Sequence, residues 1–216
     1  MNGHEFTLAP LDCPTCGAAV AAAGEDVVFY CTACRNGYRY QDEEPHLAPL
    51  EVGFVASANI SADRYLPFWV IEADVRITGR QAGRRTPARM PSLMHSFFER
   101  SGRKFETGKG RFVVPAFRSD LDATVELTRR YTASLPDLSE RLGEKLTGGC
   151  FGLEDAEKIA HFAVIATEVD RADTLRGLKY SIEFGKARLL GAPFALDSNG
   201  WVDAVHGVRL LEVELS

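Results

Sequence analysis

The sequence predicts an α+β fold, in which a small N-terminal module precedes a mixed, largely antiparallel β domain with several helices. Three observations lead to this prediction. Four of the five cysteines fall within the first 34 residues. Later segments show the apolar patterns of strands and of helices. These strands and helices do not alternate regularly, as they would in a parallel α/β fold. We expect the two domains at 1–46 and 50–216.

The composition is that of a globular protein. The 216 residues are 45% hydrophobic and 25% charged, which excludes collagen-like and wholly disordered chains. No apolar run approaches the roughly 20 residues that span a bilayer. The N-terminus lacks the basic and apolar regions of a secretory signal. We therefore expect a cytoplasmic protein without a transmembrane segment.

Four cysteines form two C-x-x-C pairs, which fourteen residues separate. In a cytosolic chain this spacing indicates a metal site rather than disulfides. Each pair forms a tight turn that presents two thiolates, and two such turns complete a closed tetrahedral shell of four sulfurs. Gly17 lets the backbone turn after the first pair. The predicted metal ligands are Cys13, Cys16, Cys31 and Cys34.

Strands are expected on either side of the second pair, at 26–30 and 37–40. With them, residues 8–45 resemble a zinc ribbon, a rubredoxin-like fold of two cysteine knuckles. The resemblance implies one structural Zn²⁺ without an open coordination position for catalysis. Iron is the less favoured alternative: sites of four sulfurs accept either metal, but Arg35 and Asn36 precede Gly37, where rubredoxins usually have a glycine and an aromatic residue. So small a segment has almost no core and needs a metal to fold.

The remaining elements follow from hydrophobic periodicity and from capping or turn residues. Residues 41–49 have the composition of an acidic linker. Strands are expected at 51–56, 68–77, 111–117, 180–184, 187–190 and 205–215. Helices are expected at 119–131, 136–146 and 154–160, with a helical turn at 173–178. Residues 162–165 fit either a helix or a strand.

Three segments pair a proline with a phenylalanine beside an apolar strand: Leu66–Trp69, Val114–Phe117 and Ala192–Ala195. Proline at a strand entrance or edge, with an aromatic ring in the core, is an ordinary structural arrangement. We favour that interpretation over an internal duplication or an aromatic binding groove.

The charge is distributed unevenly along the chain. The net charge is −5, yet residues 79–111 hold nine basic and two acidic residues, a local balance of +7 that leaves −12 elsewhere. We interpret this window as a basic insertion that contacts a partner. The candidate partners are an acidic protein surface, nucleic-acid phosphates and the anionic lipids of a membrane surface. The candidate contact residues are Arg80, Arg84, Arg85, Arg89, Arg103, Lys104, Lys109 and Arg111.

No catalytic residues are predicted. Asp155, Glu157 and His161 can lie near one another on a helix, but such sets are more typical of a helix N-terminus than of acid–base catalysis. Cys150 has no recognisable catalytic partner and is interpreted as a buried structural thiol. Asp203 and His206 lie three residues apart in a predicted turn. We therefore expect a protein that is not an enzyme.

The function predicted from these observations is that of a zinc-ribbon scaffold or adaptor subunit, which docks onto a larger protein assembly with an acidic surface. The metal would hold Arg35, Asn36, Tyr38 and Arg39 rigidly for contact, and the basic insertion would add long-range attraction. The alternative is a nucleic-acid-binding accessory factor that uses the ribbon and residues 79–111 together.

Overall fold

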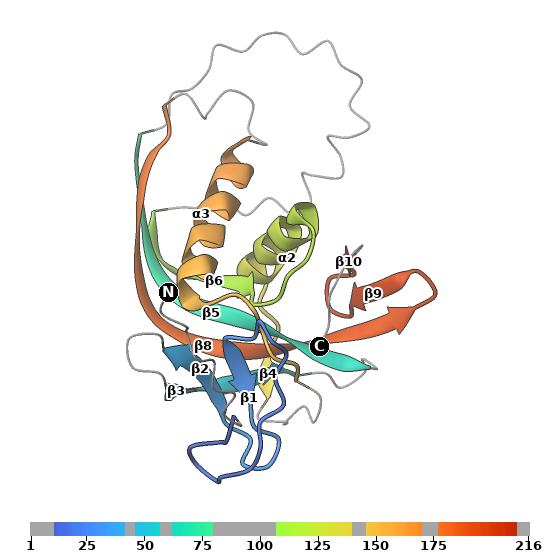
Figure 1. Ribbon diagram of the computed structural model, residues 1–216. Helices are drawn as coiled ribbons and strands as arrows, with labels where there is room; N and C mark the ends of the chain where they lie inside the picture. Colours follow the sequence, from blue (N-terminus) through green and yellow to red (C-terminus); the bar gives the residue numbers. More distant parts are fainter. Residues whose placement is uncertain are drawn as a thin grey trace, which may run out of the picture.

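The computed structural model describes residues 11–41, 46–56, 62–79, 107–139, 146–169 and 177–210. Within these ranges the chain forms a three-stranded sheet, a seven-stranded sheet and two helices (Figure 1). The strands are β1 (Val28–Tyr30), β2 (Gly37–Gln41), β3 (His46–Leu50), β4 (Val52–Val55), β5 (Arg64–Gly79), β6 (Gly108–Pro115), β7 (Leu138–Ser139), β8 (Lys179–Asp197), β9 (Gly200–Asp203) and β10 (Arg209–Leu210). The helices are α2 (Leu121–Ala133) and α3 (Leu153–Val169).

Residues 11–50 contain the small sheet, of order β1-β2-β3, and are called the ribbon below. The rest of the described chain is called the body, and it is built on β5 and β8. The whole of β5 pairs antiparallel with β8, with two register shifts, and Figure 1 shows the two strands curving side by side through the molecule. β6 pairs with β5, while β9 and β4 pair with β8. Only the pairing of β4 with β8 is parallel among these strands.

The sequence of β5 explains its central place. Its residues 66–71 form a continuous apolar run that is buried on both faces. Phe68 and Val70 pack in one cluster with Leu127 and Tyr131 of α2. The neighbouring residue Trp69 packs in a second cluster, to which α3 contributes small side chains. Because successive side chains of a strand point to opposite faces, these two clusters lie on opposite faces of β5.

The predicted α+β fold with several helices is wrong, because the structure is predominantly β with mostly antiparallel sheets. The described ranges contain two helices. The segment 136–146 has a proline at its start and a glycine pair after its end, which favours a helix. Instead Leu138 and Ser139 form β7 and pair with Val55 and Phe54 of β4, and residues 140–145 lie outside the described ranges. A long-range strand partner therefore overrides the local signal.

The other differences are smaller. Residues 46–49 are not a linker, since they belong to β3 and pair with β2. In the predicted strand 205–215, Arg209 and Leu210 form a strand, and residues 211–215 lie outside the described ranges. Most of the predicted helical turn at 173–178 also lies outside those ranges. The ambiguous segment 162–165 is helical, within α3. Neither helix of the described chain is long and apolar enough to cross a membrane.

Candidate metal centre

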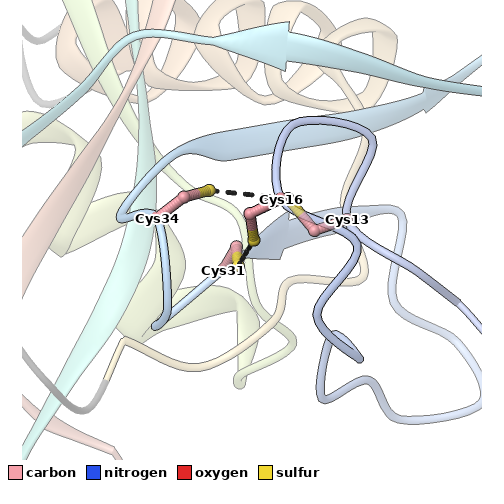
Figure 2. Close-up of side chains that lie close together, drawn as sticks. All are labelled: Cys13, Cys16, Cys31 and Cys34. Carbon is pink, nitrogen blue, oxygen red and sulfur yellow. Dashed lines mark hydrogen bonds between the residues drawn. The ribbon is translucent and has the colours of Figure 1, made fainter.

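The two cysteine pairs meet at one end of the ribbon, and all four sulfur atoms lie within 4.8 Å of one another (Figure 2). Cys13 Sγ is 3.5 Å from Cys34 Sγ, and Cys16 Sγ is 3.7 Å from Cys31 Sγ. All four thiols are free rather than disulfide-bonded. In tetrahedral zinc sites, bonds of about 2.3 Å to sulfur place the sulfur atoms about 3.8 Å apart. The sulfur separations in this cluster are close to that value, so the cluster fits a zinc ion. The prediction that these four cysteines lie together is confirmed.

The two knuckles have the same backbone geometry. In the first, the Gly17 amide donates to the Cys13 carbonyl over 2.8 Å; in the second, the Arg35 amide donates to the Cys31 carbonyl over 2.7 Å. Gly17 has φ 71° and Arg35 has φ 65°, both in the left-handed region. Sequence reasoning identified the role of Gly17 but missed Arg35. The signal was present, since each residue stands four positions after the first cysteine of its pair.

Ionisation of the thiols is unequal. Burial raises the pKa of Cys13, but hydrogen bonds from Tyr38 and from the Cys16 and Thr15 amides outweigh it and lower the pKa to about 6. At Cys16 the Ala18 amide lowers the pKa, but partial desolvation and the three neighbouring sulfurs outweigh it and raise the value to about 12. Four sulfurs so close together cannot all carry negative charge in the absence of a cation. A divalent metal removes this conflict.

The sequence suggested that Tyr38 is exposed for contact with a partner, but the structure shows that it is buried. It is 1% exposed, and its ring lies in a small ribbon core with Val20 and Phe29. Its hydroxyl lies 3.1 Å from Cys13 Sγ and 2.7 Å from the Thr15 hydroxyl. Burial, followed by the Cys13 contact, raises the pKa of Tyr38 to about 12. Sequence reasoning missed this contact because it depends on the register of β1 and β2.

The ribbon is joined to the body through backbone hydrogen bonds. The amides of Val27 and Val28 donate to the Gly149 carbonyl over 2.7 and 3.0 Å, and the Gly149 amide donates to the Val28 carbonyl over 3.0 Å. A Cβ atom on Gly149 would lie 2.7 Å from the Ala116 carbonyl, so this close approach requires glycine. Tyr30 packs edge-on against Phe54, with ring centroids 5.8 Å apart. The metal centre is therefore connected to the body by β1.

No other metal site is found in the described ranges, where the cysteines are the one grouping of three or more candidate ligands. His46 stands in β3 opposite Gln41, and His4 lies outside those ranges. A shell of four cysteines is complete, so it leaves no position for a substrate. The arrangement can hold a structural metal.

Of the eight basic residues predicted to contact a partner, the structure describes two. Lys109 and Arg111 lie on β6, directly opposite Asp74 and Glu72 of β5. Opposite residues of paired strands share a face, so these two cations stand beside carboxylates. The remaining six lie outside the described ranges: Arg80, Arg84, Arg85, Arg89, Arg103 and Lys104.

The structure gives the contacts of the side chains that were weighed for catalysis. Asp155 accepts from the Gly152 amide at the start of α3 and forms an ion pair with Lys158. His161 Nδ1 lies 3.1 Å from the Tyr180 hydroxyl. Cys150 is half-buried, and burial raises the pKa of its thiol. The Asp155 contacts lie at the start of α3, and the His161 contact joins α3 to β8.

Asp203 and His206 belong to a buried polar cluster. The Tyr131 hydroxyl donates to Asp203 over 2.5 Å, and the His206 amide donates to the same carboxylate over 2.6 Å. The His206 ring stands edge-on to Tyr131, with centroids 4.6 Å apart. Its buried Nε2 has no hydrogen-bond partner in the described part of the chain. The cluster holds the β9–β10 turn against α2.

We expect this cluster to make stability depend on pH. Burial, partly offset by Asp203, lowers the pKa of His206 below its usual 6.5. The folded state therefore favours the neutral ring, and this contribution to stability is present above pH 6.5 and lost as pH falls through the lowered value. Wild-type melting temperature should fall more between pH 7 and pH 5 than that of His206→Gln. Equal pH profiles for wild type and His206→Gln would contradict the expectation.

The three proline–phenylalanine segments meet in the core. Phe68, Phe117 and Phe194 are all buried, and their ring centroids lie 5.5 to 6.4 Å apart. The interpretation of these rings as core residues is confirmed.

Comparison of the chain with protein-family models, with curated proteins and with solved structures finds no match.

Proposed function

We propose that this chain is a zinc-binding protein, in which a structural Zn²⁺ folds the ribbon, and that the ribbon is a non-enzymatic docking module for a larger assembly with an acidic surface. The clustering of four cysteine sulfurs within 4.8 Å carries the metal part of this proposal. Zinc is favoured over iron because closed sites of four cysteines are the usual structural zinc sites. Cys13, Cys16, Cys31 and Cys34 would hold the ion and supply the core that the ribbon lacks.

Arg35 supports the docking part. It occupies the left-handed position that Gly17 occupies in the other knuckle, at a cost of about 1–2 kcal/mol for a residue with a Cβ atom. Arg35 and Asn36 are exposed at the knuckle tip. The Arg35 guanidinium forms no ion pair with the described residues. An arginine kept where glycine fits better is accounted for if its side chain meets a carboxylate of a partner.

Arg35→Gly tests docking separately from folding. We expect the variant to keep one zinc per chain and to melt within a few degrees of wild type, because relief of backbone strain offsets the added freedom of the unfolded chain. Capture of a stoichiometric acidic protein from nuclease-treated lysate should fall several-fold relative to wild type. Lys158→Gln removes one exposed positive charge from α3 and serves as the matched control.

Two outcomes would contradict the docking proposal. Equal capture by wild type and Arg35→Gly would show that the knuckle tip is not the contact. Capture that disappears on nuclease treatment, with binding that weakens steeply as salt is raised, would favour the nucleic-acid alternative. Metal analysis of the same samples decides the zinc proposal independently of either outcome.

A further inference from the structure

The four sulfurs of the metal centre lie in unequal surroundings. Cys13 and Cys31 are 2% and 1% exposed, whereas Cys16 is exposed. A thiolate that faces water is stabilised by hydrogen bonds from water, but a buried thiolate needs donors from the protein. Cys13 therefore depends on its protein neighbours for the stability of its charged form.

The side chain that meets this need is Tyr38. Its ring is held in the ribbon core, and its position opposite Phe29 in the β1–β2 pairing directs it toward the first knuckle. The hydroxyl lies 3.1 Å from Cys13 Sγ and 3.7 Å from Cys34 Sγ. It therefore reaches one sulfur from each cysteine pair. It is the one side chain outside the four cysteines that makes a hydrogen bond to their sulfurs in the described part of the chain.

Thr15 completes the arrangement. The Tyr38 hydroxyl donates to Thr15 Oγ1 over 2.7 Å, and it can accept from Cys13 when that sulfur carries a proton. A metal-bound Cys13 has no proton to give and accepts only. Both hydroxyls can rotate, so Thr15 can then donate to Tyr38, which donates to the sulfur. One short chain of hydroxyl groups thus serves the thiol and the thiolate without movement of heavy atoms.

We propose that Tyr38 is a positioning residue for the metal, whose hydroxyl donates to the buried Cys13 thiolate and thereby strengthens metal retention. This inference rests on the proposed zinc function. Partners that hydrogen-bond to metal ligands typically contribute 10–100-fold to metal affinity. The hydroxyl also withdraws electron density from the sulfur, and this effect gives the proposal a spectroscopic signature.

The test compares Tyr38→Phe with wild type in the full-length protein. Zinc affinity is measured by competition with a chromophoric chelator, and the electronic state of the sulfurs by the absorption of the Co²⁺-substituted protein. We expect Tyr38→Phe to bind zinc about ten-fold more weakly. Its sulfur-to-cobalt charge-transfer band should move to lower energy, because the thiolate becomes more electron-rich, while the tetrahedral d–d bands remain.

Tyr30→Phe is the matched control, since Tyr30 is buried on the neighbouring strand with its ring against Phe54. It should leave the affinity and the cobalt band unchanged. Thr15→Val should reduce affinity less than Tyr38→Phe, because Tyr38 can still donate to Cys13.

Unchanged affinity and an unchanged band in Tyr38→Phe would overturn the proposal. An equal loss of affinity in Tyr30→Phe would also overturn it, since the effect would then be a general weakening of the ribbon. A wild-type protein that binds neither Zn²⁺ nor Co²⁺ would instead contradict the proposed function on which the inference rests.

Discussion

Cys31→Ser is expected to abolish zinc binding and to lower the melting temperature of the body as well as unfolding the ribbon. Cys31 is 1% exposed and its sulfur belongs to the cluster. A serine hydroxyl stays protonated at neutral pH and is a poor replacement for a thiolate. Without the metal, the ribbon core consists of a few side chains around Val20, Phe29 and Tyr38. So small a core cannot offset the entropy of ordering the ribbon.

Loss of the ribbon fold should reach the body through β1. Val28 is buried in the same cluster as Trp69 of β5, and Tyr30 packs on Phe54 of β4. Burial of one such side chain contributes about 1.5–3 kcal/mol. Loss of both should remove about 3 kcal/mol or more, which corresponds to a fall of roughly 6–12 °C in the melting temperature of a chain of this size.

Hydrogen exchange would measure the unfolding of the ribbon, and thermal unfolding would measure the melting temperature of the body. Wild-type protein treated with a chelator provides the zinc-free state without a substitution. Cys150→Ser changes the one cysteine outside the cluster and should keep one zinc per chain. A body that melts at the wild-type temperature after zinc loss would show that the ribbon and the body are independent.

The metal centre was predictable because its signal is local. Two residues between the cysteines of each pair define a knuckle, and no long-range information is needed to identify the four sulfurs. The position of Tyr38 was not predictable in the same way. Its exposure depends on the pairing of β2 with β1 and on which face of that small sheet meets the knuckles. A tyrosine in an alternating segment gives no indication of this from sequence.

The body shows the same contrast. Helix α2 was predicted because Ser119 or Asp120 could cap it and because its apolar residues recur with helical spacing. The structure shows that Asp120 is the cap, accepting from the Ala123 amide over 2.8 Å. β7 and β3 were missed, since each is a strand only through its partner: β4 for Leu138–Ser139 and β2 for His46–Leu50. Composition near a proline or an acidic run does not specify such pairing.

Trp69→Ala is expected to have the second large effect, because Trp69 connects the body core to the segment that holds the ribbon. The side chain is 0% exposed, and its Nε1 donates to the Phe151 carbonyl over 2.9 Å. Phe151 stands two residues after Gly149, which exchanges backbone hydrogen bonds with Val28 of β1. We expect a loss of about 3–5 kcal/mol in unfolding free energy, measured by urea denaturation.

Trp69→Phe separates the two roles of this residue. The phenyl ring keeps much of the buried apolar surface but leaves the Phe151 carbonyl without its donor, at a cost of about 1–3 kcal/mol. If Trp69 positions the 149–151 segment, both variants should speed hydrogen exchange at the Val28 and Gly149 amides more than at Val113, whose amide is bonded to Thr132 of α2 instead. Equal acceleration at all three amides would mean that Trp69 stabilises the core without acting on the ribbon. The comparison matters for docking, because a ribbon held firmly by the body presents Arg35 and Asn36 to a partner with less entropy to lose.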